Sequence, residues 1–81
     1  QELATHHGLP KHKLQQAIDH IHDALDQELS LSDLAAIVQM SPFHFAHLFK
    51  ESTGLAPHQF VIRCRVERAK ELLIHSPLSI A

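Results

Sequence analysis

Residues 41–52 constrain the fold more than any other stretch, because they combine a helix start signal with a helical repeat. Ser41 is a residue type that caps helix N-termini, and Pro42 follows where the first turn of a helix favours proline. At about 100° per residue, four residues then fall on one side of the helix. They are Phe45, Leu48, Phe49 and Ser52. We therefore predict a helix whose apolar stripe faces a core.

The opposite side of this helix carries an aromatic ring, a methyl group, an imidazole and an ammonium group, and it has no core left to face. These side chains belong to Phe43, Ala46, His47 and Lys50. In a DNA major groove, apolar groups contact thymine methyls, while hydrogen-bond donors reach base edges and phosphates. The pattern predicts a recognition helix.

Length and composition favour one small all-α domain. The chain has 81 residues, of which 44% are hydrophobic and only two are glycine. No apolar run approaches the roughly 20 residues that span a bilayer, and no signal peptide pattern opens the chain, so no membrane partner is expected. The single cysteine, Cys64, excludes an internal disulfide and a multi-cysteine zinc site, and it favours a reducing cytoplasm.

Charge is distributed unevenly along the chain, whose net charge is −2. Residues 1–40 carry two basic and six acidic side chains, a net −4, whereas residues 41–81 carry five basic and three acidic ones, a net +2. The basic half is therefore the half with the expected recognition helix. A net +2 is still a weak electrostatic footprint for nucleic acid.

Two helices are predicted ahead of residue 41. The first covers about residues 11–27 and is acidic outside, with apolar residues at helical spacing. These are Leu14, Ile18, Ile21 and Leu25. The second begins at Ser30, with Asp33 three residues on as in a capping box. The short turn at 39–41 makes a helix-turn-helix unit, in which a positive φ at Gln39 would be strained because no glycine is present.

A longer fourth helix is predicted after the expected recognition helix. Gly54 is placed to end the third helix, and Pro57 to begin the fourth, which runs to about His75 before Ser76 and Pro77 stop it. Its predicted buried side consists of Val61, Ile62, Val66, Ala69, Leu72 and Leu73. Residues 1–10 show no periodicity, so we expect a linker or disordered start there and a domain over 11–81.

From about residue 29 onward, motifs at consistent spacing resemble the AraC/XylS-type transcription regulators. They are LSLSDLA at 29–35, MSPFHF at 40–45, LFKE at 48–51, AKELL at 69–73, and the single residues Gly54, Pro57, Phe60 and Arg65. The resemblance implies a small helical bundle with a homeodomain-like helix-turn-helix, a long connecting helix and the start of a second, truncated unit. It also implies double-stranded DNA as partner, an effector-binding or dimerisation domain upstream, and no cofactor.

By this resemblance the third helix enters a major groove. The expected base contacts are Phe43, His44, Ala46 and His47, and the expected phosphate contacts are Ser41, Lys50 and Arg63. The family commonly has arginine where His47 stands and a small polar residue where Ala46 stands. Because a neutral imidazole offers one bond where a guanidinium offers two, we expect weak DNA affinity and a preference tilted toward thymine methyls. Ala56 replaces a usual capping serine, at an expected cost of about 1 kcal/mol.

Alternatives to these roles remain open at this stage. Phe43 could instead form a hydrophobic staple at the start of the helix, rather than contact the DNA groove. His44 and His47, three residues apart, are a weak pair of metal ligands, and Arg65 is expected to be paired within the fold rather than to contact DNA. The acidic first helix is an alternative binding surface for a protein such as RNA polymerase. The sequence has no Ser/His/Asp set with plausible geometry, no glycine-rich phosphate loop and no paired carboxylates in an apolar setting, so an enzyme is poorly supported and no catalytic residue is expected.

Overall fold

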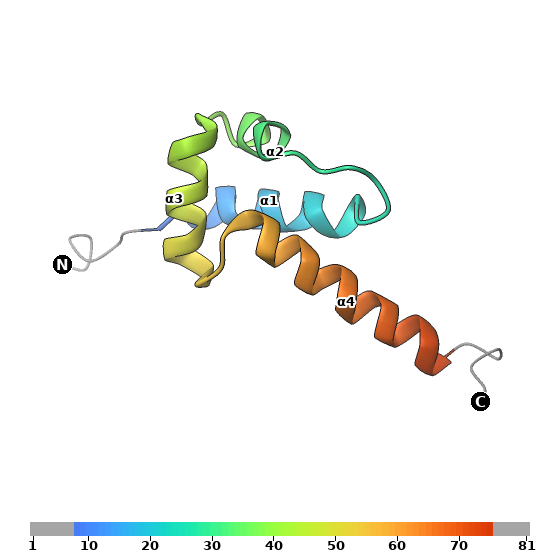
Figure 1. The fold of residues 1–81 in the computed structure, drawn as a ribbon. Helices are drawn as coiled ribbons and strands as arrows, with labels where there is room; N and C mark the ends of the chain where they lie inside the picture. The colour runs from blue at the N-terminus through green and yellow to red at the C-terminus, as the bar shows by residue number, and fades with distance from the viewer. Residues whose placement is uncertain (1–7, 76–81) are drawn as a thin grey trace.

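The computed structural model describes residues 8–75, which form four helices and contain no strand. They are α1 (Lys11–Asp23), α2 (Leu31–Ile37), α3 (Pro42–Thr53) and α4 (Pro57–His75). Figure 1 shows α1, α2 and α3 gathered into a bundle, from which α4 projects. The all-α prediction is confirmed. No helix in this part of the chain is both long and apolar enough to cross a membrane.

The core is built around two aromatic residues of α3. Phe45 and Phe49 are fully buried, with ring centroids 5.5 Å apart. Phe49 also meets Phe60 of α4 edge to face at 5.2 Å, which ties the long helix to the bundle. The other buried members of this cluster are Leu9, Ala17, Ile21, Leu34, Ala35, Val38 and Val61. The predicted inward stripe of α3 is confirmed, with Leu48 partly buried against the same cluster.

The domain begins earlier than the sequence pattern indicates. Leu9 is only 2% exposed and belongs to the core, and its N–H donates to the Ser52 hydroxyl at 2.8 Å. Gly8 lies against the same serine, where an added Cβ would collide with the side chain. A linker at residues 1–10 is therefore wrong for residues 8 and 9, because one apolar side chain fills a place that no local periodicity reveals. Residues 1–7 lie outside the described part.

The first helix ends four residues before the predicted end at residue 27. Ala24 leaves helical geometry with φ −120° and ψ 28°. In the loop after α1, two backbone carbonyls bind the Arg65 guanidinium of α4. Its Nε donates to the Leu25 carbonyl at 3.0 Å, and its Nη2 donates to the Gln27 carbonyl at 2.7 Å. The structural pairing predicted for Arg65 is confirmed. Its partners are backbone carbonyls, which hold the start of the α1–α2 loop against α4.

The turn between α2 and α3 contains the strained residue that the sequence suggests. The side chain of Ser30 accepts from the Asp33 N–H and caps α2 at its start. At the other end, Gln39 has φ 61°, and the N–H groups of Gln39 and Met40 reach back to the carbonyls of Ala36 and Ala35. This is a Schellman arrangement, in which glycine normally occupies the left-handed position.

Gln39→Gly is expected to raise the free energy of unfolding by about 0.5–1 kcal/mol. A residue with a side chain pays roughly 1 kcal/mol to adopt the left-handed conformation, and glycine removes this cost. Glycine also has more freedom in the unfolded chain, which offsets part of the gain. The matched control is Gln16→Gly, an exposed position in the middle of α1, where the same change should destabilise by about 1 kcal/mol. Urea denaturation of both variants measures the two signs; a destabilised Gln39→Gly would contradict the strain.

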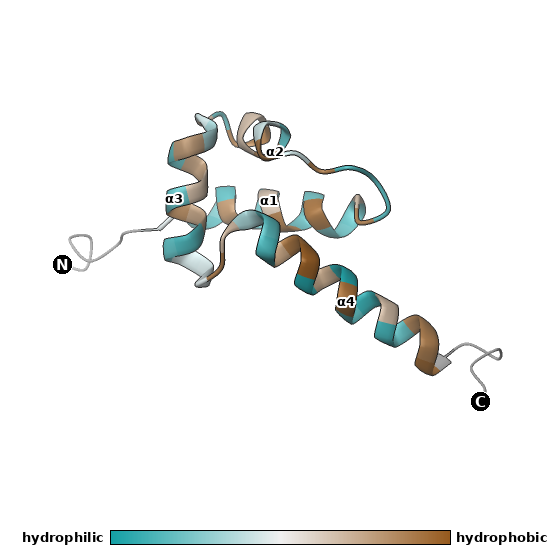
Figure 2. Cartoon of the chain, viewed as in Figure 1, coloured by the Kyte–Doolittle hydropathy of each residue, from teal (hydrophilic) through white to brown (hydrophobic). Residues whose placement is uncertain are grey.

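The predicted buried side of α4 is mostly wrong. Only Val61, in the first turns of the helix, is buried; the remaining predicted residues are exposed. They are Ile62 (54%), Val66 (48%), Ala69, Leu72 (62%) and Leu73 (64%). Figure 2 shows apolar residues continuing along α4 where it leaves the bundle, and no described element buries them. The predicted stop at 76–77 and the expected start of a second unit at 78–81 lie outside the described residues.

Candidate nucleic-acid interface

The N-terminus of α3 is capped as its sequence predicts. The Ser41 side chain accepts from the His44 N–H at 3.2 Å, and Pro42, which has no N–H, occupies the first turn. The Phe43 N–H makes no hydrogen bond with any described residue, so it is the amide of this turn that remains available to an anion. The helix ends at Gly54, whose φ of 85° is the left-handed conformation expected there.

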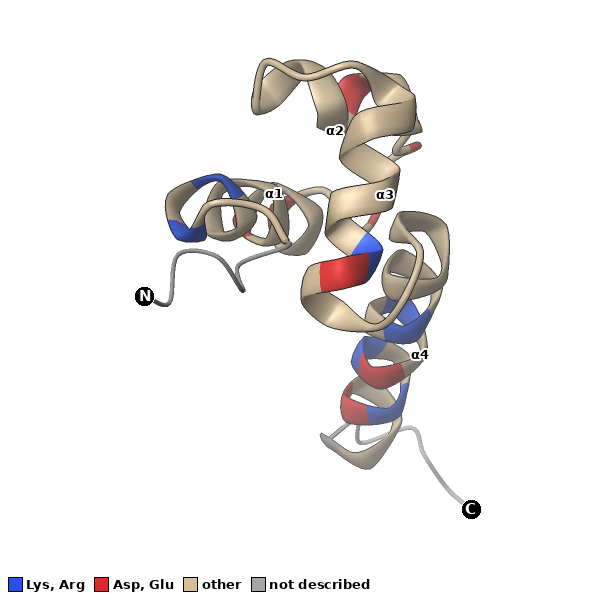
Figure 3. Cartoon of the chain, turned by 90° about the vertical axis from the view of Figure 1, so that its left-hand side faces the viewer, with Lys and Arg blue, Asp and Glu red and all other residues tan. Residues whose placement is uncertain are grey.

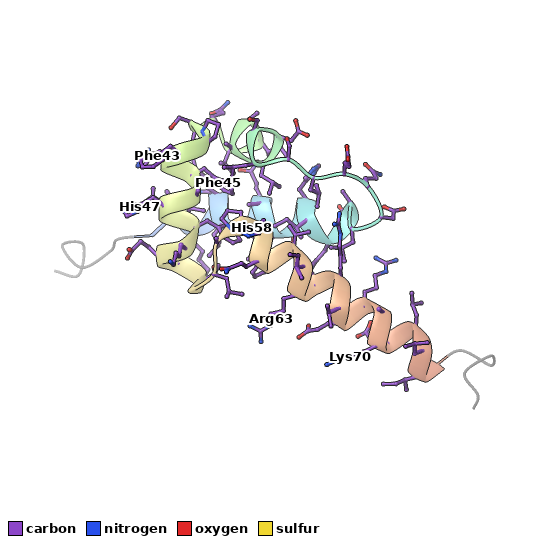
Figure 4. The ribbon with its side chains drawn as sticks, in the orientation of Figure 1. Phe43, Phe45, His47, His58, Arg63 and Lys70 are labelled. Atoms are coloured by element: carbon purple, nitrogen blue, oxygen red, sulfur yellow. The ribbon has the colours of Figure 1, made fainter. Side chains whose placement is uncertain are left out.

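The outer face of α3 is centred on Phe43, His47 and Lys50, all of which are exposed. Phe43 is 86% exposed, and Figure 4 shows Phe43 and His47 pointing away from the bundle while Phe45 points into it. The hydrophobic staple is therefore wrong for Phe43, because a ring so exposed packs against nothing. The division of α3 into an inward and an outward face is confirmed.

Ala46 lies at one edge of this outer face rather than at its centre. It is half-buried and lines a groove of about 350 Å³ between α2, α3 and α4. The groove is mainly apolar, with Leu31 and Ile62 among its exposed walls and His58 and Arg65 beside them. His44, also exposed, lies about 160° from Ala46 across the outer face and so at the opposite edge. The outer face of α3, which we also call the reading face, is therefore centred on Phe43, His47 and Lys50 and is narrower than the sequence pattern indicates.

Formal charge on α3 is confined to one end. Lys50 and Glu51 lie near the C-terminus of α3 and are its only lysine, arginine or acidic residues, and Figure 3 shows the remainder of the helix without basic or acidic colouring. On α4, Arg63 pairs with Glu67 one turn later, with Nε 3.7 Å from Oε2 and both side chains exposed. Figure 4 shows Arg63 and Lys70 projecting from the same side of α4. Because an exposed ion pair of this kind is weak, it leaves Arg63 able to exchange Glu67 for a phosphate.

The start of α4 has a cap that the sequence reasoning missed. Ala56 has no capping oxygen, but its N–H donates to Oε1 of Gln59 at 3.1 Å. This is the returning half of a capping box, and it offsets part of the cost expected for alanine at this position. The signal was present as glutamine three residues after the cap. The preceding turn is held by Thr53, whose hydroxyl accepts from the Leu55 N–H and donates to the carbonyl of Phe49 or of Leu55.

A metal site would require a cluster of ligating side chains among the described residues, and a reactive thiol would require a lowered pKa. Between residues 8 and 75, no three histidine, cysteine or acidic side chains gather in a way that would hold a metal ion. Cys64 is partly buried against the core, and burial raises the pKa of its thiol, with Glu67 raising it further and Arg63 opposing. The thiol is therefore protonated at neutral pH and serves as a packing group.

Comparison with known proteins identifies the fold family from these same segments. The sequence profile described as helix-turn-helix domain matches residues 34–81, which is more than half of the chain. This chain belongs to the AraC-type helix-turn-helix family. The matched region covers most of α2, the whole of α3 and α4, and the turns between them.

Several regulators are similar to this chain. Regulatory protein PocR of Salmonella typhimurium is 41% identical over 69 residues, covering 85% of this chain and 23% of the relative. The MmsAB operon regulatory protein of Pseudomonas aeruginosa is 36% identical and the lactose operon transcription activator of Staphylococcus xylosus 29% identical; the matches cover 76% and 84% of this chain. They cover 20% and 24% of those relatives. No solved structure matches the chain.

The AraC-type family membership decides between the two functions that the sequence left open. The chain is a DNA-binding module of a transcription regulator, and the alternative of a protein-interaction domain acting through the acidic face of α1 is not favoured. The family is also not a class of enzymes.

Proposed function

We propose that α3 enters the major groove of double-stranded DNA and reads base edges with its outer face. The observation that carries this proposal is Phe43, an aromatic ring 86% exposed on a helix whose other face is fully used by Phe45 and Phe49. Phe43 contacts thymine methyls, and His47, one turn further on, donates to a base acceptor. Ala46 and His44, at the two edges of the face, contact the flanking bases.

Phosphate contacts would fix the orientation of α3 on the duplex. Ser41 and the unbonded Phe43 N–H offer an anion-binding point at the positive end of the helix dipole. Lys50 lies at the other end of the same face, where it meets a phosphate on the far side of the groove. Arg63 reaches the backbone from α4 after releasing Glu67.

The experiment selects duplexes from a randomised pool with the 81-residue chain and measures Kd for a selected and an unselected duplex. We expect binding to weaken steeply between about 50 and 200 mM salt. Phe43→Ala and His47→Ala should each lose about 1–3 kcal/mol of the preference for the selected duplex.

His22→Ala, at an exposed position near the far end of α1, is the control and should keep that preference. Enrichment of no sequence, or a preference that survives both α3 variants, would contradict the proposal.

In the whole protein, we propose that this module lies in the cytoplasm and acts with an effector-binding or dimerisation domain upstream and with RNA polymerase. In support, the chain spans about a quarter of the length of PocR and the lactose operon activator. A second helix-turn-helix unit would cover the stripe of Ile62, Val66 and Leu73 on α4, which the described residues leave exposed.

A further inference from the structure

The outer face of α3 is poor in permanent positive charge for a surface that meets phosphates. Among the twelve residues of this helix, Lys50 is the only lysine or arginine, and Glu51 stands beside it. Two imidazoles, His44 and His47, are exposed on the same helix, one and four residues after the exposed Phe43. The charge that this face presents to a duplex therefore depends on whether those imidazoles are protonated.

We infer that DNA binding by this chain takes up protons, with His44 and His47 engaging the duplex as imidazolium groups. The inference rests on the proposed function and adds the chemical form in which these residues act. A duplex carries about one negative charge per 1.7 Å of its axis, and this field favours the protonated imidazole. Histidine is the side chain whose ordinary titration range lies near neutral pH, so the field of the duplex decides its state.

Protonation also changes what each imidazole can donate. A neutral imidazole has one N–H donor, whereas an imidazolium has two. His47 lies between Phe43 and Lys50 along the reading face, so one N–H is directed to a base acceptor and the other to the backbone. His44, at the edge of the face and within the first turn, directs one N–H to a flanking base and the other to a phosphate beside the groove. Each imidazolium supplies a charge-assisted bond that the neutral ring lacks.

The surroundings of the two imidazoles leave them available to a duplex. On α3 itself, the charged residues nearest in sequence to His47 are Lys50 and Glu51, three and four positions on. The helices packed against α3 carry Asp33 on α2 and His58, Arg63 and Arg65 on the first turns of α4, and Arg65 already donates to the carbonyls of Leu25 and Gln27. No carboxylate of a described residue lies within ion-pair distance of either imidazole. The partner that stabilises their charge is therefore the DNA.

The sign of the effect follows from linkage. If the complex holds more protons than the free chain, affinity rises as pH falls through the range where histidine titrates, about pH 8 to pH 6. Each coupled imidazole contributes up to a tenfold change in Kd per pH unit within that range. With two imidazoles taking part, we expect Kd to tighten by at least about tenfold between about pH 8 and pH 6.

The test measures Kd by fluorescence anisotropy at about pH 6 and pH 8 and constant ionic strength, with a duplex selected at about pH 8. The wild-type chain should bind at least about tenfold more tightly at the lower pH. A chain with both His44→Gln and His47→Gln should show almost no pH dependence. His22→Gln, on α1 and away from the reading face, is the matched control and should keep the wild-type dependence.

Isothermal titration calorimetry in two buffers of different ionisation enthalpy counts the protons directly. Net uptake near neutral pH should disappear in the double variant, whose folding at both pH values is checked by circular dichroism. Sequence-preferring binding without pH dependence would overturn the proton linkage and leave the proposed function intact. A double variant that keeps the wild-type pH dependence would do the same, whereas no DNA binding at any pH would overturn both.

Discussion

Phe49→Ala is expected to lower the free energy of unfolding by about 3–5 kcal/mol, the range for removing a fully buried aromatic ring. Its ring is 0% exposed, contacts Phe45 within α3, and meets Phe60 of α4 at an interplanar angle of 88°. Removing it opens a cavity at the point where the two helices join. A domain of this size has little stability in reserve, so much of the population should be unfolded at room temperature.

The matched control for this prediction is Phe43→Ala on the same helix. Phe43 is 86% exposed, so removing its ring should change the free energy of unfolding by less than about 0.5 kcal/mol. Urea denaturation followed by far-ultraviolet circular dichroism measures both variants. Comparable losses from the two substitutions would show that α3 does not divide its faces between core and solvent as described.

The elements that the sequence could predict are those specified by local signals. The start of α3 follows from Ser41 and Pro42, its end from Gly54, and its inward face from the spacing of Phe45 and Phe49. Each of these depends on residues within one or two turns of each other, where helix geometry leaves few alternatives. The outward position of Phe43 follows by exclusion once the inward face is assigned.

What the sequence could not predict depends on contacts between distant residues. The Leu9 side chain lies in the core, and the Leu9 N–H donates to the hydroxyl of Ser52, forty-three residues away. No hydrophobic periodicity around residue 9 predicts this position. The first helix ends early, at a loop held by Arg65 from α4. For α4, the pattern identified an apolar stripe, but whether Val66 is covered depends on which element packs there, and the pattern has no information on that.

The reading face shows the same division between local and distant information. Helical spacing places Ala46 on the same side of α3 as Phe43 and His47, and the structure agrees with this only approximately. The structure shows Ala46 at the edge, half-buried beside a groove whose other walls come from α2 and α4. An angular difference of this size cannot be assigned without the neighbouring helices. Because Ala46 lies at the edge, we expect Phe43 and His47 to contribute more to base discrimination than Ala46 does.

His47→Arg is expected to create a preference for guanine at one position of the selected duplex, by about 1–3 kcal/mol, or roughly 5- to 150-fold. A guanidinium bonds guanine O6 and N7 together, which a single imidazole nitrogen cannot do. His47 is exposed and Phe43 lies one turn before it, so the longer side chain extends over that ring without disturbing the core. Duplex selection from a randomised pool, followed by Kd for duplexes differing at that position, measures the change.

His47→Lys separates geometry from charge in this prediction, because lysine adds a permanent positive charge without the planar fork of donors. Both variants should bind all duplexes more tightly than the wild-type chain at about pH 8, since each adds a cation facing the phosphates. Only the arginine variant should gain the guanine preference through two parallel bonds. An equal preference in both variants would show that the charge, rather than the two-bond contact, selects the base. No preference in either would mean that position 47 faces the backbone, and the base-reading role would then fall to Phe43 and the edge residues.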